Sequence, residues 1–270
     1  MHIKMIATDL DGTLLRADKS ISGYAADVFR CLRKSGIIVV FATGRPEMAI
    51  VEFAKIIMPH GIISNNGAGV SINGSTIFEQ CMEPVSVKTI VSGLRELGDI
   101  KLILNYGDYS LTNHDDYQIW GSWGPVHHCD FTDYNTADVL KIAIEAQDVS
   151  LLSNIDFAAL GCWWHGNVGE PWYMVMANGV SKLAAIKIAA AHFNIDVSEV
   201  AAFGDDENDI EMLRGCGIGV AMENAIDEAK AAADYICGSN ENDGVAKWLE
   251  AHILSDLDGG IAGRAVCTSK

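Results

Sequence analysis

The sequence predicts an α/β protein with a parallel β-sheet in its core and a second, α+β unit inserted into that core. Apolar segments typical of buried strands alternate with helical segments in residues 1–83 and again in residues 179–270, and this alternation favours a parallel sheet. Residues 84–178 break the rhythm and contain five of the six tryptophans. We therefore expect a discontinuous core of residues 1–83 and 179–270 around an inserted domain of residues 84–178.

The first core segment is expected to begin with a buried strand, because an apolar run ends abruptly at Asp9. Apolar residues at helical spacing then predict a helix that ends before Gly36, and the β-branched run after it predicts a second buried strand. Pro46 is expected in the first turn of the next helix. Asn73-Gly74 is a favoured hairpin turn. The expected strands are residues 3–8, 37–42 and 62–63, and the expected helices are residues 22–35 and 46–58.

The second core segment repeats this pattern of helices and strands. Its final stretch, residues 256–270, is rich in glycine and polar residues, and we expect a loose tail there. The expected helices are residues 181–193, 209–214, 225–232 and 245–253, and the expected strands are residues 200–203 and 218–221.

The composition argues against several partners and compartments. A net charge of -17 and a pI of about 4.7 give the chain no electrostatic reason to bind nucleic acid or an anionic membrane. The 7 cysteines are irregularly spaced and form no CxxC pair, which is typical of reduced thiols in the cytoplasm. No apolar run approaches the ~20 residues of a membrane span, and the amino-terminal residues are not those of a signal peptide.

Polar clusters follow three of the predicted strands. Asp9 and Asp11 come after the first strand, Thr43-Gly44 after the second, and a run of acidic residues from Asp205 to Asp209 after a later one. Because the carboxyl ends of parallel strands share one edge, these clusters should converge. Carboxylates at this density repel one another unless a cation offsets them, and hard oxygen ligands suit Mg2+. The alternative for the third cluster is a simple helix cap.

Two further features, Lys182 and the Thr43-Gly44 turn, become candidates for function because the carboxylates are predicted to lie near them. Lys182 opens a predicted helix, where a cation opposes the helix dipole, and a residue that breaks a local rule is a candidate for function. Its ammonium group could steady the carboxylates near Asp9 and hold phosphate oxygens. The hydroxyl of Thr43 and backbone N–H groups such as that of Gly44, at the start of the following helix, could bind an anion, although an ordinary strand-to-helix turn explains that motif as well.

These motifs, in this order, resemble the four motifs of the haloacid dehalogenase (HAD) superfamily, and the finer pattern resembles its Cof-like, subfamily IIB phosphatases. The resemblance implies a Rossmann-like parallel-sheet core and a cap of the C2 type over residues 84–178, which closes over the site and selects the substrate. The hinges would lie near Glu83-Pro84 and Asn178-Gly179. The matching residues are Asp9-Leu10-Asp11-Gly12-Thr13, Thr43-Gly44, Lys182 and Gly204-Asp205 with Asn208-Asp209.

The resemblance also implies a role for each matching residue. Asp9 would be the nucleophile that forms an aspartyl phosphate, and Asp11 the general acid and base. The cofactor Mg2+ would be held by the carboxylate of Asp9, the backbone carbonyl of Asp11 and Asp205, with Asp209 acting on it indirectly. The residues implied for phosphate binding are Thr43, Gly44, Lys182 and Asn208.

We therefore predict a Mg2+-dependent phosphatase whose partner is a small phosphorylated metabolite, with a sugar phosphate as the first expectation. Asp11 favours a phosphatase or a phosphomutase, because related ion pumps carry Thr at this position and dehalogenases lack the acid. A phosphomutase, or a binding protein that kept the fold and lost the chemistry, are the alternatives.

The predicted cap offers weaker signals. Trp163, Trp164, His165 and Trp172 could stack on a sugar, but the core of a small domain also needs large apolar groups. His127-His128-Cys129 and Cys162-x-x-His165 hint at zinc, yet they lack the second half of a CxxC-type site.

Overall fold

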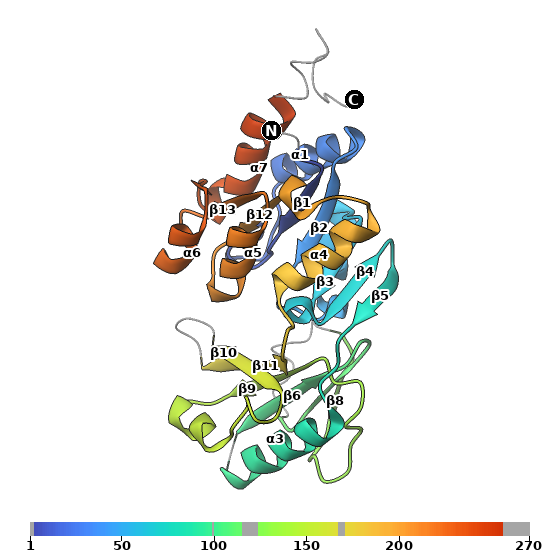
Figure 1. The fold of residues 1–270 in the computed structure, drawn as a ribbon, viewed down its shortest axis with the longest axis vertical. Helices are drawn as coiled ribbons and strands as arrows, with labels where there is room; N and C mark the ends of the chain where they lie inside the picture. The colour runs from blue at the N-terminus through green and yellow to red at the C-terminus, as the bar shows by residue number, and fades with distance from the viewer. Residues whose placement is uncertain (1–2, 99, 115–123, 167–170, 256–270) are drawn as a thin grey trace.

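The computed structural model describes residues 3–98, 100–114, 124–166 and 171–255, and it has two parts joined at a narrow waist (Figure 1). The larger part is built on an eight-stranded sheet and the smaller on a six-stranded sheet. This confirms the predicted α/β core with a second, mixed α+β domain. The predicted tail, together with Trp120 and Trp123, lies outside the described residues.

The core sheet is parallel from β14 to β3 and ends in an antiparallel hairpin. The hairpin turns at Asn73 and Gly74, both with positive φ, as the favoured two-residue turn requires. In sheet order, the strands are β14 (Tyr235–Ile236), β13 (Ile218–Ala221), β12 (Val200–Gly204), β1 (Met5–Thr8), β2 (Ile38–Ala42), β3 (Gly61–Ser64), β4 (Gly69–Ile72) and β5 (Ser75–Glu79).

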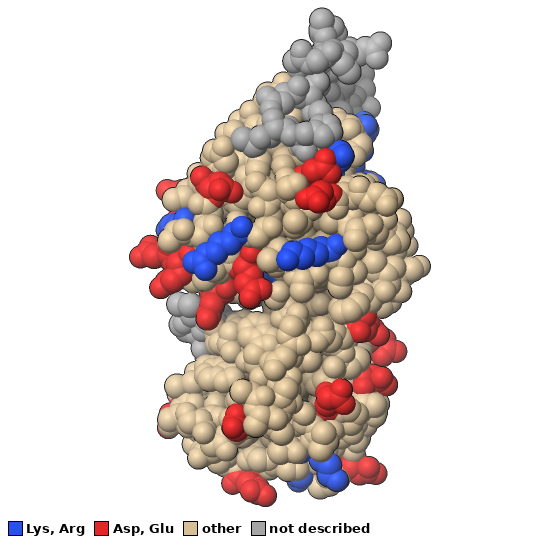
Figure 2. Space-filling view, in the orientation of Figure 1, with Lys and Arg blue, Asp and Glu red and all other residues tan. Residues whose placement is uncertain are grey.

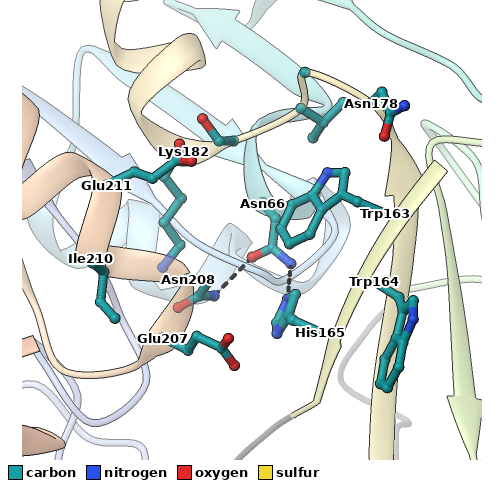
Figure 3. A pocket seen from close by; sticks show the side chains of 13 residues that line it. Asn66, Trp163, Trp164, His165, Asn178, Lys182, Glu207, Asn208, Ile210 and Glu211 are labelled. Atoms are coloured by element: carbon teal, nitrogen blue, oxygen red, sulfur yellow. Dashed lines mark hydrogen bonds between the residues drawn. The ribbon is translucent and has the colours of Figure 1, made fainter. Parts of the chain in front are cut away.

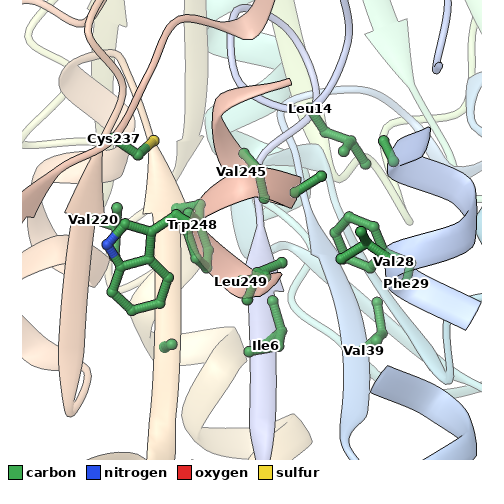
Figure 4. Packing of buried hydrophobic residues seen from close by; sticks show 14 of the residues in the cluster. Ile6, Leu14, Val28, Phe29, Val39, Val220, Cys237, Val245, Trp248 and Leu249 are labelled. Atoms are coloured by element: carbon green, nitrogen blue, oxygen red, sulfur yellow. The ribbon is translucent and has the colours of Figure 1, made fainter. Parts of the chain in front are cut away.

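Helices cover both faces of this sheet, which explains why its strands are apolar throughout. Along β1 the side chains alternate: Ile6 packs in one cluster, whereas Met5 and Ala7 pack in the other. Figure 4 shows the first cluster, in which Ile6 lies near Leu249, and the ring of Trp248 lies toward Val220. The helices of the core are α1 (Gly23–Lys34), α2 (Val51–Ile57), α4 (Lys182–His192), α5 (Ile210–Gly215), α6 (Asp227–Ala232) and α7 (Gly244–Leu249).

The smaller part, called the cap below, has an apolar core of its own between its helix and its sheet. Its helix is α3 (Pro84–Glu96), with Pro at the first helical position. All strand pairs of the sheet are antiparallel except β7 with β8. In sheet order, the strands are β10 (Cys162–Gly166), β11 (Trp172–Ala177), β9 (Lys141–Glu145), β6 (Lys101–Asn105), β7 (Ser110–Thr112) and β8 (Val126–His128).

The helix expected over residues 46–58 is wrong as a single element. The chain forms a 3-10 turn at Glu47–Ala49 and only then the helix α2. Ser71 on β4 donates a hydrogen bond of 2.6 Å to the Glu47 carboxylate, and this contact holds the turn against the sheet. The helices expected at residues 225–232 and 245–253 differ only at their ends, the latter continuing as a π-helical turn at Glu250–Leu254.

Figure 2 shows one face of the molecule, on which Lys and Arg side chains are interspersed with Asp and Glu near the core's edge toward the cap. None of the helices in the described ranges is both long enough and apolar enough to cross a membrane.

Candidate active site at the cap–core boundary

The predicted motifs meet at the carboxyl edge of the core sheet. Asp9 directly follows β1, Thr43 follows β2, and Asp205 follows β12. These three strands are neighbours in the order β12-β1-β2. The convergence expected from the sequence is therefore present, and Lys182 joins it from the first position of α4.

Lys182 forms a buried ion cluster with two carboxylates. Its Nζ donates hydrogen bonds of 2.7 Å to Asp9 Oδ1 and 2.6 Å to Asp209 Oδ1. The three residues are 1%, 5% and 0% exposed, so water screens these charges little. Burial raises the pKa of Asp9, and the Lys182 ammonium opposes that rise. The two carboxylates outweigh the effect of burial on Lys182 and raise its pKa, which keeps the ammonium protonated.

Asp205 approaches this cluster because a glycine makes room for it. Thr13 Oγ1 donates a 2.6 Å hydrogen bond to Asp205 Oδ1. Gly12 has φ of +77°, and a Cβ there would lie 2.2 Å from Asp205 Oδ2. Both the conformation and the space require glycine. Burial, followed by the negative charge of Asp209, raises the pKa of Asp205 to about 7.

The donor set of this site fits a hard divalent cation. Among the residues that the structure describes, Asp9, Asp205 and Asp209 each offer a carboxylate oxygen within 4.8 Å of the other two. Burial raises the pKa of Asp9 and of Asp205, a cation would offset the negative charge of such carboxylates, and oxygen ligands suit Mg2+. Asp209 is already engaged elsewhere: its Oδ2 accepts the backbone N–H groups of Asp205 at 2.9 Å and Asp206 at 3.2 Å.

The helix-cap alternative for the acidic run is correct for one of its members. Asp206 caps the 3-10 turn Glu207–Asp209, in a reciprocal capping box with Asp209. Asp205 is not part of this cap, and its carboxylate points to the cluster around Asp9.

Asp11 is held by Arg45, for which the sequence alone predicted no role. Arg45 donates from Nε to Asp11 Oδ2 at 2.6 Å and from Nη2 to Oδ1 at 2.7 Å, and Lys19 Nζ lies 2.7 Å from Oδ1. Burial favours a higher pKa for Asp11, but the hydrogen bonds and charges of Arg45 and Lys19 outweigh it and lower the pKa. The position of Arg45 directly after Thr43-Gly44 was the available signal.

Thr43 and Gly44 form the loop between β2 and the 3-10 turn. Thr43 is buried, and its Oγ1 accepts the backbone N–H of Arg45 at 3.2 Å. The helix amino terminus expected beside this loop is not there, because α2 begins only at Val51. Anion binding here would depend on the backbone N–H groups and the hydroxyl of the loop rather than on a helix dipole.

Asn66 connects the core loops with the cap, which the sequence alone did not indicate. Its Oδ1 accepts from Asn208 Nδ2 at 2.9 Å, and its Nδ2 lies 3.1 Å from His165 Nε2 of β10 (Figure 3). Asn65, Asn66 and Gly67 all have positive φ. A Cβ on Gly67 would lie 2.2 Å from the carbonyl oxygen of Ser181, so this loop packs against the start of the Lys182 helix. Asn208, expected to bind phosphate, donates its hydrogen bond to Asn66 in this structure.

A cleft of about 550 Å³ opens at the boundary between cap and core (Figure 3). The ring of Trp163 stacks on that of His165 with centroids 5.5 Å apart. Burial lowers the pKa of His165 to about 4, so its ring is neutral at neutral pH. The lining residues are Asn66, Trp163, Trp164, His165, Asn178, Gly179, Val180, Ser181, Lys182, Glu207, Asn208, Ile210 and Glu211.

The other cap signals do not form a site together. Cys162 and His165 are three positions apart on β10 and therefore point to opposite faces of the sheet. Cys162 packs in the core of the cap, whereas His165 faces Asn66. Trp172 lies on β11 and is not among the residues that line the cleft.

The comparisons with known proteins agree with this geometry. The family of haloacid dehalogenase-like hydrolases matches residues 6–249. The similar proteins include 5-amino-6-(5-phospho-D-ribitylamino)uracil phosphatases. One of Bacillus subtilis is 28% identical, over 92% of this chain and 97% of the relative, and one of Escherichia coli is 29% identical, over 91% and 94%.

A solved haloacid dehalogenase-like hydrolase from Bacteroides thetaiotaomicron has a TM-score of 0.82 at 26% identity, covering 92% of this chain and 99% of that one. The family match includes both core segments and the cap. The chain therefore belongs to the haloacid dehalogenase-like hydrolases and is a phosphatase of the Cof-like group.

Proposed function

We propose that this phosphatase hydrolyses a small phosphomonoester through an aspartyl phosphate on Asp9, with Mg2+ as cofactor. The observation that carries the proposal is the ion cluster of Asp9 with Lys182, 2.7 Å apart, beside Asp205 at the carboxyl edge of the sheet. A buried carboxylate fixed in one orientation is suited to in-line attack on phosphorus.

In the proposed reaction, a carboxylate oxygen of Asp9 forms a bond to phosphorus while the bond from phosphorus to the ester oxygen breaks. Asp11 donates the proton that the leaving alcohol takes up. Water then attacks the aspartyl phosphate, Asp11 accepts its proton, and inorganic phosphate leaves. Mg2+, held by Asp9, Asp205 and the backbone carbonyl of Asp11, would offset the charge of the phosphoryl group.

The ion pair of Asp11 with Arg45 suits the second half of this cycle, in which Asp11 must be ionised. In the first half Asp11 must carry a proton. A bound phosphoryl group would compete for the Arg45 guanidinium, which binds phosphate as readily as carboxylate. Releasing Asp11 from Arg45 would let its pKa rise toward that of a proton donor. Thr43, the Gly44 N–H and Lys182 are the proposed phosphate ligands, with Asn208 acting through Asn66.

Residues 84–178 are the proposed cap that closes over this site, hinged near Glu83-Pro84 and Asn178-Gly179. Two observations support these boundaries. The cap helix α3 begins at Pro84, and Gln80 Nε2 donates a 2.8 Å hydrogen bond to the carbonyl oxygen of Asn178, which joins the two connections. Closing the cap would exclude water from the aspartyl phosphate.

The cleft beside Lys182 is the proposed site of the leaving group. Its volume of about 550 Å³ suits a metabolite rather than a macromolecule. The side-chain amide of Asn178, which lines the cleft, could bind sugar hydroxyls, which supports a sugar phosphate. The stacked rings of Trp163 and His165 favour a second candidate, the phosphoribitylaminouracil named for the two relatives, because it joins a polyol phosphate to a flat ring.

The test is a phosphate-release screen over sugar phosphates, nucleotides, pyridoxal phosphate, flavin mononucleotide and phosphoribitylaminouracil. Each compound is tested with Mg2+, with EDTA and with Asp9→Asn. We expect release that requires Mg2+ and disappears in the variant. Isomerised product without free phosphate would show a phosphomutase, and identical behaviour of Asp9→Asn and the parent would overturn the proposal.

A further inference from the structure

Lys141 belongs to the cap but contacts the phosphate loop of the core. It is the first residue of β9, and its side chain is only 2% exposed. Its Nζ donates a 2.6 Å hydrogen bond to the carbonyl oxygen of Gly44. A long, flexible cation of the cap is thus fixed at the loop whose N–H and hydroxyl groups are the proposed phosphate ligands.

The three buried Lys and Arg residues in the described part of the chain differ in what balances their charge. Arg45 is bonded to Asp11, and Lys182 to Asp9 and Asp209. The hydrogen-bond partner of Lys141 is a neutral carbonyl group. Burying an ammonium group with no counter-charge is unfavourable, so this arrangement would gain from an anion beside it.

The groups around Lys141 point to the same kind of ligand. Burial lowers the pKa of Lys141 to about 7, and it is the one cause of that shift, so a carboxylate does not offset it. The nearby His165 is neutral, because burial and then the positive charges of Lys141 and Lys182 hold its pKa low. Lys182 is itself neutralised by Asp9 and Asp209. Among the described residues, the surroundings of Lys141 therefore lack the negative charge that a bound phosphate would bring.

We infer that Lys141 is a substrate-binding residue contributed by the cap, whose ammonium group binds a phosphate oxygen of the phosphomonoester when the cap is closed. This inference rests on the proposed function. A phosphate bound at the Gly44 N–H would lie within reach of Nζ, which already touches the carbonyl oxygen of the same residue. Because the buried ammonium is balanced only when an anion is present, the closed cap is favoured by phosphorylated ligands.

The test compares Lys141→Met, which removes the charge but keeps the length, with Lys88→Met at an exposed position on α3 of the cap. The probe is orthovanadate, a phosphate analogue, added with Mg2+, and its affinity is measured by calorimetry. One charged hydrogen bond predicts an affinity about 10-fold to 100-fold weaker for Lys141→Met. In Lys88→Met we expect the parent's affinity.

Thermal unfolding separates this role from a structural one. If Lys141 binds the phosphate group, the ligand-free Lys141→Met protein should have the parent's melting temperature or a higher one. The reason is that the substitution removes a buried charge that has no counter-charge. Adding orthovanadate should then raise the melting temperature of Lys141→Met less than that of the parent. A lower melting temperature without ligand, with unchanged orthovanadate affinity, shows a structural latch and overturns the inference.

The kinetic readout distinguishes this inference from the proposed function. With the best substrate of the screen, Lys141→Met should raise KM about 10-fold or more and leave some Mg2+-dependent turnover, which Asp9→Asn abolishes. If no substrate is hydrolysed but orthovanadate still binds more weakly to Lys141→Met, the proposed function fails and the inference holds. Equal orthovanadate affinity of the parent and Lys141→Met, or no orthovanadate binding by either protein, contradicts the inference.

Discussion

The Nζ atom of Lys182 donates a 2.7 Å hydrogen bond to Asp9 Oδ1, although the two residues are 173 positions apart in the chain. Asp9 follows the central strand β1, and Lys182 begins the helix α4 that covers the same sheet. Because the two groups are buried, neither can be removed without leaving the other's charge in a site with little water.

Replacing Lys182 with Met should therefore reduce both stability and activity. Two buried carboxylates, Asp9 and Asp209, lose their counter-charge, and breaking a buried ion pair costs on the order of 3–5 kcal/mol. The rate of phosphate release should fall by roughly 10²–10³-fold, as for loss of one donor to the transition state. Urea unfolding and steady-state kinetics measure the two effects. Lys187→Met, at an exposed position of the same helix, should behave like the parent, and a Lys182→Met protein as stable as the parent would contradict the account.

Gly12→Ala should inactivate the enzyme, whereas Gly36→Ala should not. Both glycines have positive φ, 77° and 83°, so alanine costs about 1–2 kcal/mol at either position. At Gly12 the added Cβ would also lie 2.2 Å from Asp205 Oδ2, while at Gly36 nothing lies within 4 Å. We expect comparable backbone strain and a loss of Mg2+-dependent activity only in Gly12→Ala. Full activity in both variants would show that the position of Asp205 is not critical.

The stability of the metal-free protein should fall as the pH rises. The pKa of Asp205 is about 7 in the folded protein instead of the ordinary 3.8, and that of Asp9 is raised too. A carboxyl group with a raised pKa binds more protons in the folded state, so its stabilising effect is complete below about pH 4 and is lost as the pH approaches 7. Urea unfolding at a series of pH values measures this slope.

Mg2+ should remove this pH dependence, because it binds the ionised carboxylates. The gain in stability on adding Mg2+ should be larger at pH 8 than at pH 5, and about 2.7 kcal/mol when Mg2+ is at 100 times its Kd. In Asp205→Asn, both the dependence of the unfolding free energy on pH and its increase on adding Mg2+ should become smaller. An equal gain at the two pH values would argue that the cation does not bind at Asp9 and Asp205.

Arg45→Met should shift the pH profile of kcat/KM to higher pH. The guanidinium of Arg45, acting against burial, helps to hold the pKa of Asp11 below its ordinary value, so its removal lets that pKa rise. Asp11 then keeps its proton to higher pH, which moves the alkaline limb of the profile upward, because kcat/KM reports the first half of the cycle, in which Asp11 donates a proton. Arg30→Met, at an exposed position of α1, is the matched control. A profile that keeps its midpoints in Arg45→Met would remove Asp11 from the proposed role.

The parts of the site that lie at strand ends were predictable from the sequence. Asp9, Thr43 and Asp205 each follow an apolar run, and parallel strands bring such positions to one edge. Lys182 was found because a cation at a helix start breaks a local rule, and the structure explains the exception with two carboxylates. In these cases a short-range pattern and the topology of the sheet are sufficient.

The contacts between cap and core were not predictable in the same way. Asn66, His165 and Lys141 meet only because the cap sheet packs against the core loops, and no local spacing encodes that packing. Weak signals were present: Asn65-Asn66-Gly67 is a composition that favours positive φ, and Lys141 interrupts an apolar strand. The split of the helix after Pro46 also depends on a distant contact, the hydrogen bond from Ser71 to Glu47.

The central claim, covalent catalysis by Asp9, is tested most directly by trapping the intermediate. The enzyme is mixed with Mg2+ and its best substrate, quenched in acid during turnover, and analysed by peptide mass spectrometry. We expect one added phosphoryl group on the peptide containing Asp9 in the parent and none in Asp9→Asn. With an aryl phosphate, whose leaving group needs no proton, the phosphorylated peptide should accumulate in Asp11→Asn, because the hydrolytic water lacks its base. Phosphate release with no phosphorylated peptide in either the parent or Asp11→Asn would contradict the account and indicate direct attack by water.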